Sequence, residues 1–111
     1  ADSDEIVEDQ GVKTRFFSTT KQDSETHSPK IELLEPTGQA TPIGKFLQNR
    51  GPGVQQICFR VENLVDMISL LKENSIVMID EVPRIGAGGK SIAFVHPKST
   101  GGVLVELTQY E

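Results

Sequence analysis

The chain has 111 residues, a formal net charge of −5, 36% hydrophobic residues and no tryptophan, which is the size of one small domain with a lean core. No apolar run is long enough for a transmembrane helix, and no basic segment followed by an apolar stretch indicates a signal peptide. The single cysteine, Cys58, excludes an internal disulfide framework and a cysteine-rich zinc site, and we interpret it as a small core residue.

The first part of the chain predicts strands followed by a short helix. Its β-branched and aromatic stretches indicate a weak strand and two clearer ones, at 5–9, 12–20 and 30–35. Thr41 and Pro42 are typical of a helix N-cap and first turn, so a short helix is expected over 42–49. The density of glycine and proline at 51–53 then marks a linker.

The second part predicts a strand, a helix and three further strands. The strand at 54–61 is followed by Asn63 and Asp66, whose spacing resembles a capping box. An apolar stripe at helical spacing follows, formed by Leu64, Met67, Ile68 and Leu71. The three later strands are expected at 76–79, 91–96 and 103–108, with a glycine-rich loop at 83–90.

The two parts resemble copies of one unit. Both contain similar strand endings, Lys-Ile-Glu-Leu-Leu at 30–34 and Val-Leu-Val-Glu-Leu at 103–107. We therefore expect a single domain over 1–111, in which 1–50 is a first module lacking its opening strand and helix and 54–111 is a complete second module.

Three polar residues interrupt predicted strands. Glu106 shares a strand face with Leu104 and Thr108, Glu32 has a similar setting, and Gln56 lies on the first strand of the second module. If these side chains converge in a cavity, their oxygens suit a hard or borderline divalent ion. If the strand faces are open to solvent, the same residues are ordinary surface groups.

Other polar candidates carry weaker signals. His27 lies in a polar loop and His96 at a strand end, where a surface or turn role competes with a catalytic or ligand role. The glycine-rich segment at 86–89 lacks the Gly-Lys-Ser/Thr ending of a phosphate loop. It is either a mobile loop over a cavity or a long hairpin connection.

Six phrases of the chain resemble the methylmalonyl-CoA epimerase family of the vicinal-oxygen-chelate superfamily, which includes glyoxalase I and the bleomycin-resistance proteins. They are Lys-Ile-Glu-Leu-Leu-Glu-Pro at 30–36, Thr-Pro-Ile-Gly-Lys-Phe-Leu at 41–47, Ile-Cys-Phe-Arg-Val at 57–61, Asp-Glu-Val-Pro-Arg-Ile-Gly-Ala-Gly-Gly-Lys at 80–90, Phe-Val-His-Pro-Lys at 94–98 and Gly-Gly-Val-Leu-Val-Glu-Leu-Thr-Gln-Tyr at 101–110. The resemblance implies an α+β fold of paired β-α-β-β-β modules, the first truncated at its N-terminus.

The resemblance also implies a reaction, inversion of the carbon between a carboxylate and a CoA thioester. In that family a base removes the α-proton, a divalent metal stabilises the enolate, and a second group returns a proton to the other face. Carried over by position, Glu32 and Glu106 match metal-ligand positions, and Glu106 also matches a residue proposed to transfer the proton.

Two departures from the family pattern stand out. The opening strand that carries a histidine ligand has no counterpart here, and Gln55-Gln56 stand where the family usually has His-His. Gln56 would then bind metal through its amide oxygen, so affinity for cobalt, nickel, zinc or magnesium is expected to be weakened. The missing strand would leave an open sheet edge that a partner strand could pair with.

Two functions therefore remain open. One is an epimerase-like isomerase acting on a CoA thioester, and the other is a non-catalytic relative, a small-molecule binding module or assembly partner that has lost the metal site. We expect a homodimer or a strand-completing partner chain and a cytoplasmic location, or the mitochondrial matrix in a eukaryote. The neutral body of the chain argues against nucleic acid, and the acidic start against a membrane partner.

Overall fold

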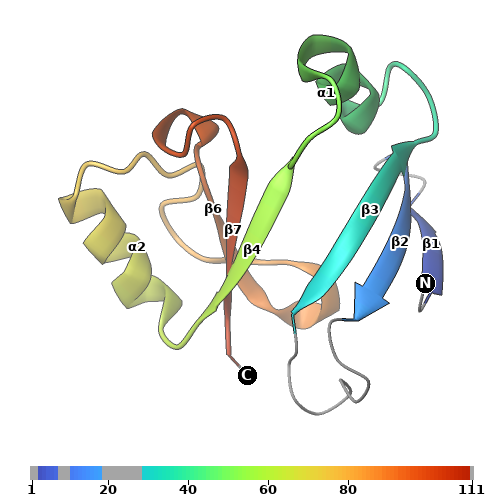
Figure 1. Ribbon diagram of the computed structural model, residues 1–111. Coiled ribbons are helices and arrows are strands. Elements are labelled where there is room, and N and C mark those ends of the chain that lie inside the picture. The colour runs from blue at the N-terminus through green and yellow to red at the C-terminus, as the bar shows by residue number, and fades with distance from the viewer. Residues whose placement is uncertain (1–2, 8–10, 19–28, 111) are drawn as a thin grey trace. The chain divides into compact units, whose positions relative to one another are not determined.

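The computed structural model describes residues 3–7, 11–18 and 29–110, and the chain divides into two compact units, Ala1–Gly53 and Val54–Glu111. Figure 1 shows the strands and helices of each unit.

The first unit is an antiparallel sheet followed by a helix. Its strands β1 (Ser3–Val7), β2 (Val12–Ser18) and β3 (Lys30–Pro36) lie in the order β1-β2-β3. In the β2–β3 register, Phe16 is opposite Glu32. The three predicted strands are confirmed, and the first begins two residues earlier than expected; residues 8–9 of the predicted 5–9 strand and 19–20 of the predicted 12–20 strand lie outside the described residues.

Helix α1 (Pro42–Arg50) begins and ends as its sequence predicts. The Thr41 hydroxyl accepts a hydrogen bond from the Gly44 amide at 3.1 Å, which caps the first turn. At the other end, Gly51 adopts a φ of 73° and donates its N–H to the Leu47 carbonyl at 2.9 Å. That left-handed conformation suits glycine, so the helix stops where the linker starts.

The second unit has the order strand, helix and three strands. It consists of β4 (Gln56–Val61), α2 (Leu64–Glu73), β5 (Arg84–Ile85), β6 (Ser91–Val95) and β7 (Leu104–Gln109), with 3₁₀ turns η2 (Ala87–Gly89) and η3 (Pro97–Ser99). The sheet order is β4-β7-β6-β5, in which β4 and β7 are parallel and the other neighbours antiparallel. With two α-helices and two sheets among the residues that the structure describes, the expected α+β class is confirmed.

Helix α2 covers one face of this sheet (Figure 1). The buried core consists of Leu64, Ile68, Met78, Ala93, Val95 and Leu107. Because side chains alternate along a strand, Leu107 on the α2 face requires Glu106 and Thr108 to point to the opposite face. The core therefore fixes which side of the sheet carries the polar residues.

The predicted strand at 76–79 is wrong. An isolated bridge joins Met78 to Val95, flanked by backbone hydrogen bonds from the Ile79 amide to the Phe94 carbonyl and from the His96 amide to the Val77 carbonyl. The Phe94 amide donates to the Asp80 side chain at 2.8 Å in place of a backbone carbonyl, so the pairing does not extend into a ladder. The additional strand is instead β5, inside the segment predicted as a loop at 83–90. The outer strand of the sheet is thus formed by 84–85 and not by the apolar run at 76–79.

The prediction that Cys58 is a core residue is also wrong, because the residue is exposed. It lies on β4, an edge strand of its sheet, and faces away from α2 together with Gln56 and Arg60. An apolar strand at a sheet edge does not imply burial of both faces.

Candidate functional site

The polar face of the second sheet joins two of the predicted site residues. Gln56 on β4 donates from Nε2 to Glu106 Oε1 on β7 at 2.7 Å. In the parallel register, Gln56 is opposite Leu104 and Cys58 opposite Glu106, so the amide reaches one step diagonally across the two strands. The sequence-predicted proximity of these two residues is therefore seen in the structure.

The surroundings of Glu106 are part apolar and part open. On the β6 side its register partner is Phe94, on the β4 side Cys58, and Glu106 itself is half-buried. A half-buried carboxylate with one oxygen bound by an amide keeps its second oxygen for another partner. This arrangement suits a group that accepts a proton or binds a cation.

The third predicted ligand, Glu32, belongs to the first unit. It is exposed on β3, on the sheet face that also carries Phe16 and Leu34. Within the second unit, the structure brings together Gln56 and Glu106. Glu32 occupies the corresponding strand of the other unit, as the repeated strand endings predict.

The histidines add no second cluster among the described residues. His96 caps a turn, since its Nδ1 accepts from the Lys98 amide at 3.0 Å, which is the turn role considered for it. His27 lies outside the described residues. Over the part of the chain that the structure describes, no three His, Cys, Asp or Glu side chains gather to hold a metal ion.

The glycine-rich segment connects two strands of a hairpin. The Gly86 amide donates to the Lys90 carbonyl at 2.8 Å, and β5 pairs with β6 through Arg84 opposite Ile92. This favours the hairpin interpretation over a separate loop. Arg84 is not among the sequence-predicted site residues, because it falls in the segment expected to be a loop and nothing in the local sequence distinguishes it from a surface arginine.

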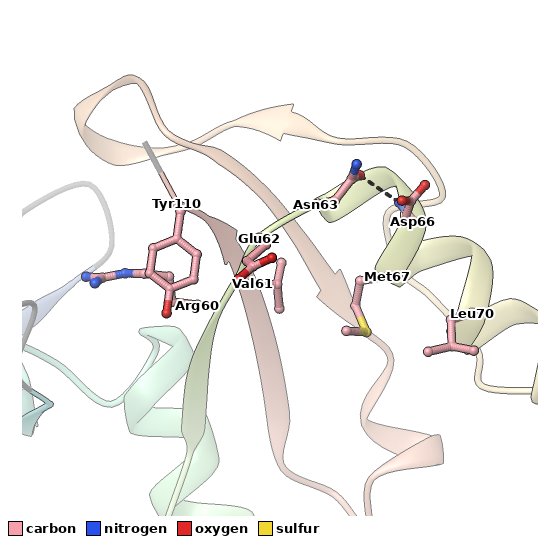
Figure 2. A pocket seen from close by; sticks show the side chains of 8 residues that line it. All are labelled: Arg60, Val61, Glu62, Asn63, Asp66, Met67, Leu70 and Tyr110. Atoms are coloured by element: carbon pink, nitrogen blue, oxygen red, sulfur yellow. Dashed lines mark hydrogen bonds between the residues drawn. The ribbon is translucent and has the colours of Figure 1, made fainter.

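A groove of about 520 Å³ lies where β4 passes into α2 and contains none of the predicted site residues. It is lined by Arg60, Val61, Glu62, Asn63, Asp66, Met67, Leu70 and Tyr110. Figure 2 shows Arg60 beside the Tyr110 ring, with Met67 and Leu70 on the other side of the groove. The Arg60 guanidinium carbon lies 5.3 Å from the centre of that ring, a cation–π distance.

Comparisons with known proteins agree on one family. The sequence model of the glyoxalase/bleomycin resistance protein/dioxygenase superfamily matches residues 2–94. The chain is 39% identical over 105 residues to the uncharacterized protein YqjC of Bacillus subtilis, covering 95% of this chain and 70% of that protein. It is 47% identical over 81 residues to the human mitochondrial methylmalonyl-CoA epimerase, covering 72% of this chain and 46% of the human protein.

A solved structure shows the same fold. A variant of the Streptomyces coelicolor methylmalonyl-CoA epimerase, in complex with 2-nitronate-propionyl-CoA, superposes with a TM-score of 0.71 at 30% identity. The match covers 97% of this chain and 74% of that one. The chain thus spans about three quarters of the solved relative and less than half of the human one.

The expected glyoxalase-like, vicinal-oxygen-chelate fold is confirmed by these matches. The β-α-β-β-β order of the second unit and the epimerase relatives point the same way. The chain belongs to the glyoxalase/bleomycin resistance protein/dioxygenase superfamily, within its methylmalonyl-CoA epimerase family.

Proposed function

We propose that the chain is an epimerase-like protein that moves a proton at the α-carbon of a carboxyacyl-CoA thioester, of which methylmalonyl-CoA is the example. The observation that carries the proposal is the 2.7 Å hydrogen bond from Gln56 to Glu106 on the open face of the second sheet. The substrate class, a CoA thioester, is taken from the human and Streptomyces coelicolor methylmalonyl-CoA epimerases that the chain resembles.

Glu106 is the residue that we assign to proton transfer. Inversion at a carbon next to a thioester needs a base to remove the α-proton and a donor to return one. The Gln56 amide holds Oε1 of Glu106, which fixes the orientation of the carboxylate and leaves Oε2 to take or return the proton.

The residues proposed to hold a divalent ion are Glu32, Gln56 and Glu106. Two carboxylates and an amide oxygen are donors that magnesium accepts and that cobalt, nickel or zinc accept less readily than imidazole. In the hydrogen-bonded arrangement the Gln56 Nε2 faces Glu106, so Gln56 would bind the ion only after its amide turns to present the oxygen. The hydrogen bond to Glu106 would then be replaced by coordination of both side chains to the ion. When bound, such an ion supplies a Lewis acid for the negative charge that develops on the thioester oxygen.

This assignment treats both units as modules of one domain, 1–50 and 54–111. Glu32 and Glu106 occupy the same step of the repeated strand ending, in Ile-Glu-Leu and Val-Glu-Leu. A double-mutant cycle with Glu32→Gln and Glu106→Gln tests the shared ion. If both side chains bind one ion, the two losses of Mg²⁺ or Co²⁺ affinity are strongly non-additive, whereas additive losses contradict a shared site.

The second function is a non-catalytic relative that binds a small molecule or another chain. The observation in its favour is that the Gln56 amide nitrogen, a hydrogen-bond donor, faces the Glu106 carboxylate. This hydrogen bond satisfies the amide nitrogen and one carboxylate oxygen of the pair, and it presents a donor where an ion would need the amide oxygen.

One experiment separates the two functions. The purified protein is incubated in D₂O with methylmalonyl-CoA and with Mg²⁺, Co²⁺, Ni²⁺ or Zn²⁺, and deuterium at the α-carbon is followed by mass spectrometry. The epimerase proposal predicts exchange above the rate of buffer and metal alone. Binding of the thioester without exchange under every metal supports the non-catalytic relative.

The proposal extends to the assembly of the chain and to its location in the cell. A homodimer or a strand-completing partner is proposed because β3 and β4 are edge strands of their sheets. None of the described helices is long and apolar enough to cross a membrane. A CoA thioester substrate favours the cytoplasm, or the mitochondrial matrix in a eukaryote.

A further inference from the structure

Arg84 lies on the same sheet face as Glu106. It is opposite Ile92 in the β5–β6 register, and Ile92 is opposite Thr108. Two residues further along β6, on the same face, Phe94 is opposite Glu106. Residues paired in register point to the same side of a sheet. Strand β5, which the sequence did not predict, therefore places the Arg84 cation on the sheet face of the proposed site.

The Arg84 guanidinium is held in place by two anchors. Its Nε lies 3.3 Å from Asp80 Oδ1, and its central carbon lies 5.2 Å from the centre of the Phe94 ring. The other oxygen of Asp80 accepts the Phe94 amide at 2.8 Å. Both anchors are thus tied to Phe94, the cross-strand partner of Glu106.

This arrangement prepares the guanidinium for a ligand. The Asp80 carboxylate lies beside Nε, and the two terminal amino groups of the fork carry the other N–H donors. The side chain of Arg84 is 56% exposed while that of Asp80 is 17% exposed, so the anchor is covered and the cation is open. An arginine already fixed by stacking and an ion pair loses less conformational entropy when it binds an anion.

We propose that Arg84 binds the free carboxylate of the acyl group, which makes it a specificity residue for carboxyacyl thioesters. The inference rests on the proposed function, in which the α-carbon lies at Glu106. The carboxylate is attached directly to that carbon, and planar guanidinium matches planar carboxylate with two parallel hydrogen bonds. The phosphates of CoA are the other anions of the ligand, but the pantetheine arm separates them from the reacting carbon.

Binding of two probes separates these anions. Methylmalonyl-pantetheine carries the acyl carboxylate and no phosphate, whereas propionyl-CoA carries the phosphates and no acyl carboxylate. For Arg84→Gln, we expect affinity for methylmalonyl-pantetheine to fall by about 10- to 100-fold, the range for a lost hydrogen-bonded charge. Affinity for propionyl-CoA should stay within about 3-fold, and Arg84→Lys should recover part of the loss because it keeps the charge without the fork.

Arg60→Gln is the matched control. Arg60 lies on the same sheet face, at the other edge of the sheet, and is stacked on Tyr110. An equal loss in Arg60→Gln would reduce the effect to general electrostatics and overturn the inference. A loss confined to propionyl-CoA would assign Arg84 to phosphate, and unchanged binding of methylmalonyl-pantetheine would remove it from the site. Wild-type protein that binds neither probe contradicts the proposed function itself, and circular dichroism confirms that each variant is folded.

Discussion

Gln56 and Glu106, 50 positions apart in the sequence, meet across two parallel strands through a hydrogen bond of 2.7 Å. On the opposite face of β7, Leu107 is buried against α2. Gln56 and Glu106 can therefore meet only on the face away from the helix. The core of the second unit thereby determines where its chemistry lies.

Replacement of Gln56 by histidine tests the ligand assignment. Gln56→His is expected to raise affinity for Zn²⁺, Co²⁺ or Ni²⁺ by roughly 10-fold or more, because imidazole nitrogen is a better ligand than an amide oxygen for these ions. Isothermal titration calorimetry measures the change. Gln55→His, at the residue just before β4 begins, is the control and should leave affinity unaltered. Equal gains in both variants, or none in Gln56→His, would contradict the assignment.

The N-cap of α2 is expected to hold the second unit together. The Asn63 side chain accepts the Asp66 amide at 3.0 Å, and the helix supplies buried Leu64 and Ile68 to the core. Asn63→Ala should lower the free energy of unfolding by about 1 kcal/mol in urea denaturation. Ser69→Ala, an exposed change on the same helix, should stay within about 0.5 kcal/mol of wild type; a loss equal to that of Asn63→Ala would argue against capping.

A buried hydroxyl offers a stabilising change. Thr108 Oγ1 is buried and has no hydrogen-bond partner among the residues that the structure describes. Thr108→Val keeps the shape of the side chain and removes the unpaired group, so unfolding should become less favourable by about 1 kcal/mol. Thr100→Val is the opposite case, because the Thr100 hydroxyl donates to the Pro97 carbonyl at 3.1 Å. This substitution should lower the free energy of unfolding. Destabilisation by Thr108→Val would show that the hydroxyl has a partner.

The Lys72–Glu81 pair predicts a pH-dependent contribution to stability. The Lys72 ammonium, 2.6 Å from the carboxylate, lowers the pKa of Glu81 through a hydrogen bond and its charge. A lowered folded-state pKa means that the contribution is present above the unfolded value and is lost as pH falls through the folded one. The thermal midpoint of Glu81→Gln should therefore be slightly lower than that of wild type at neutral pH. In acid the two midpoints should be equal.

Salt distinguishes this contribution from packing. Both side chains are exposed, so the difference between Glu81→Gln and wild type at neutral pH should shrink in about 1 M NaCl, where charges are screened over about 3 Å. A difference that persists in acid and in high salt would contradict the ion-pair explanation.

Local signals predicted the structure of both units well where one physical rule decided the outcome. Asn63 and Thr41 cap helices because their side chains bond amides three residues later, an effect contained within one turn. Alternation placed Glu106 with Leu104 and Thr108 because burial of Leu107 leaves them the other face. These features required no knowledge of distant segments.

Sequence reasoning failed where tertiary pairing overrides local preference. The apolar run at 76–79 forms a single bridge because Asp80 takes the Phe94 amide, and the short strand β5 exists because β6 offers it an edge. Cys58 is exposed for a similar reason, since β4 is an edge strand whose polar face lies away from α2. Arg84 was overlooked because its setting depends on all of these pairings.

The most direct test of the account measures solvent deuterium entering the α-carbon of methylmalonyl-CoA in the presence of wild-type protein, Glu106→Gln and Glu73→Gln. Glu73, an exposed acid at the end of α2, is the matched control. We predict exchange by wild type and Glu73→Gln, and a rate lower by roughly 10²- to 10⁴-fold for Glu106→Gln with an unchanged thermal midpoint. Exchange by folded Glu106→Gln at the wild-type rate would contradict the assignment of proton transfer to Glu106.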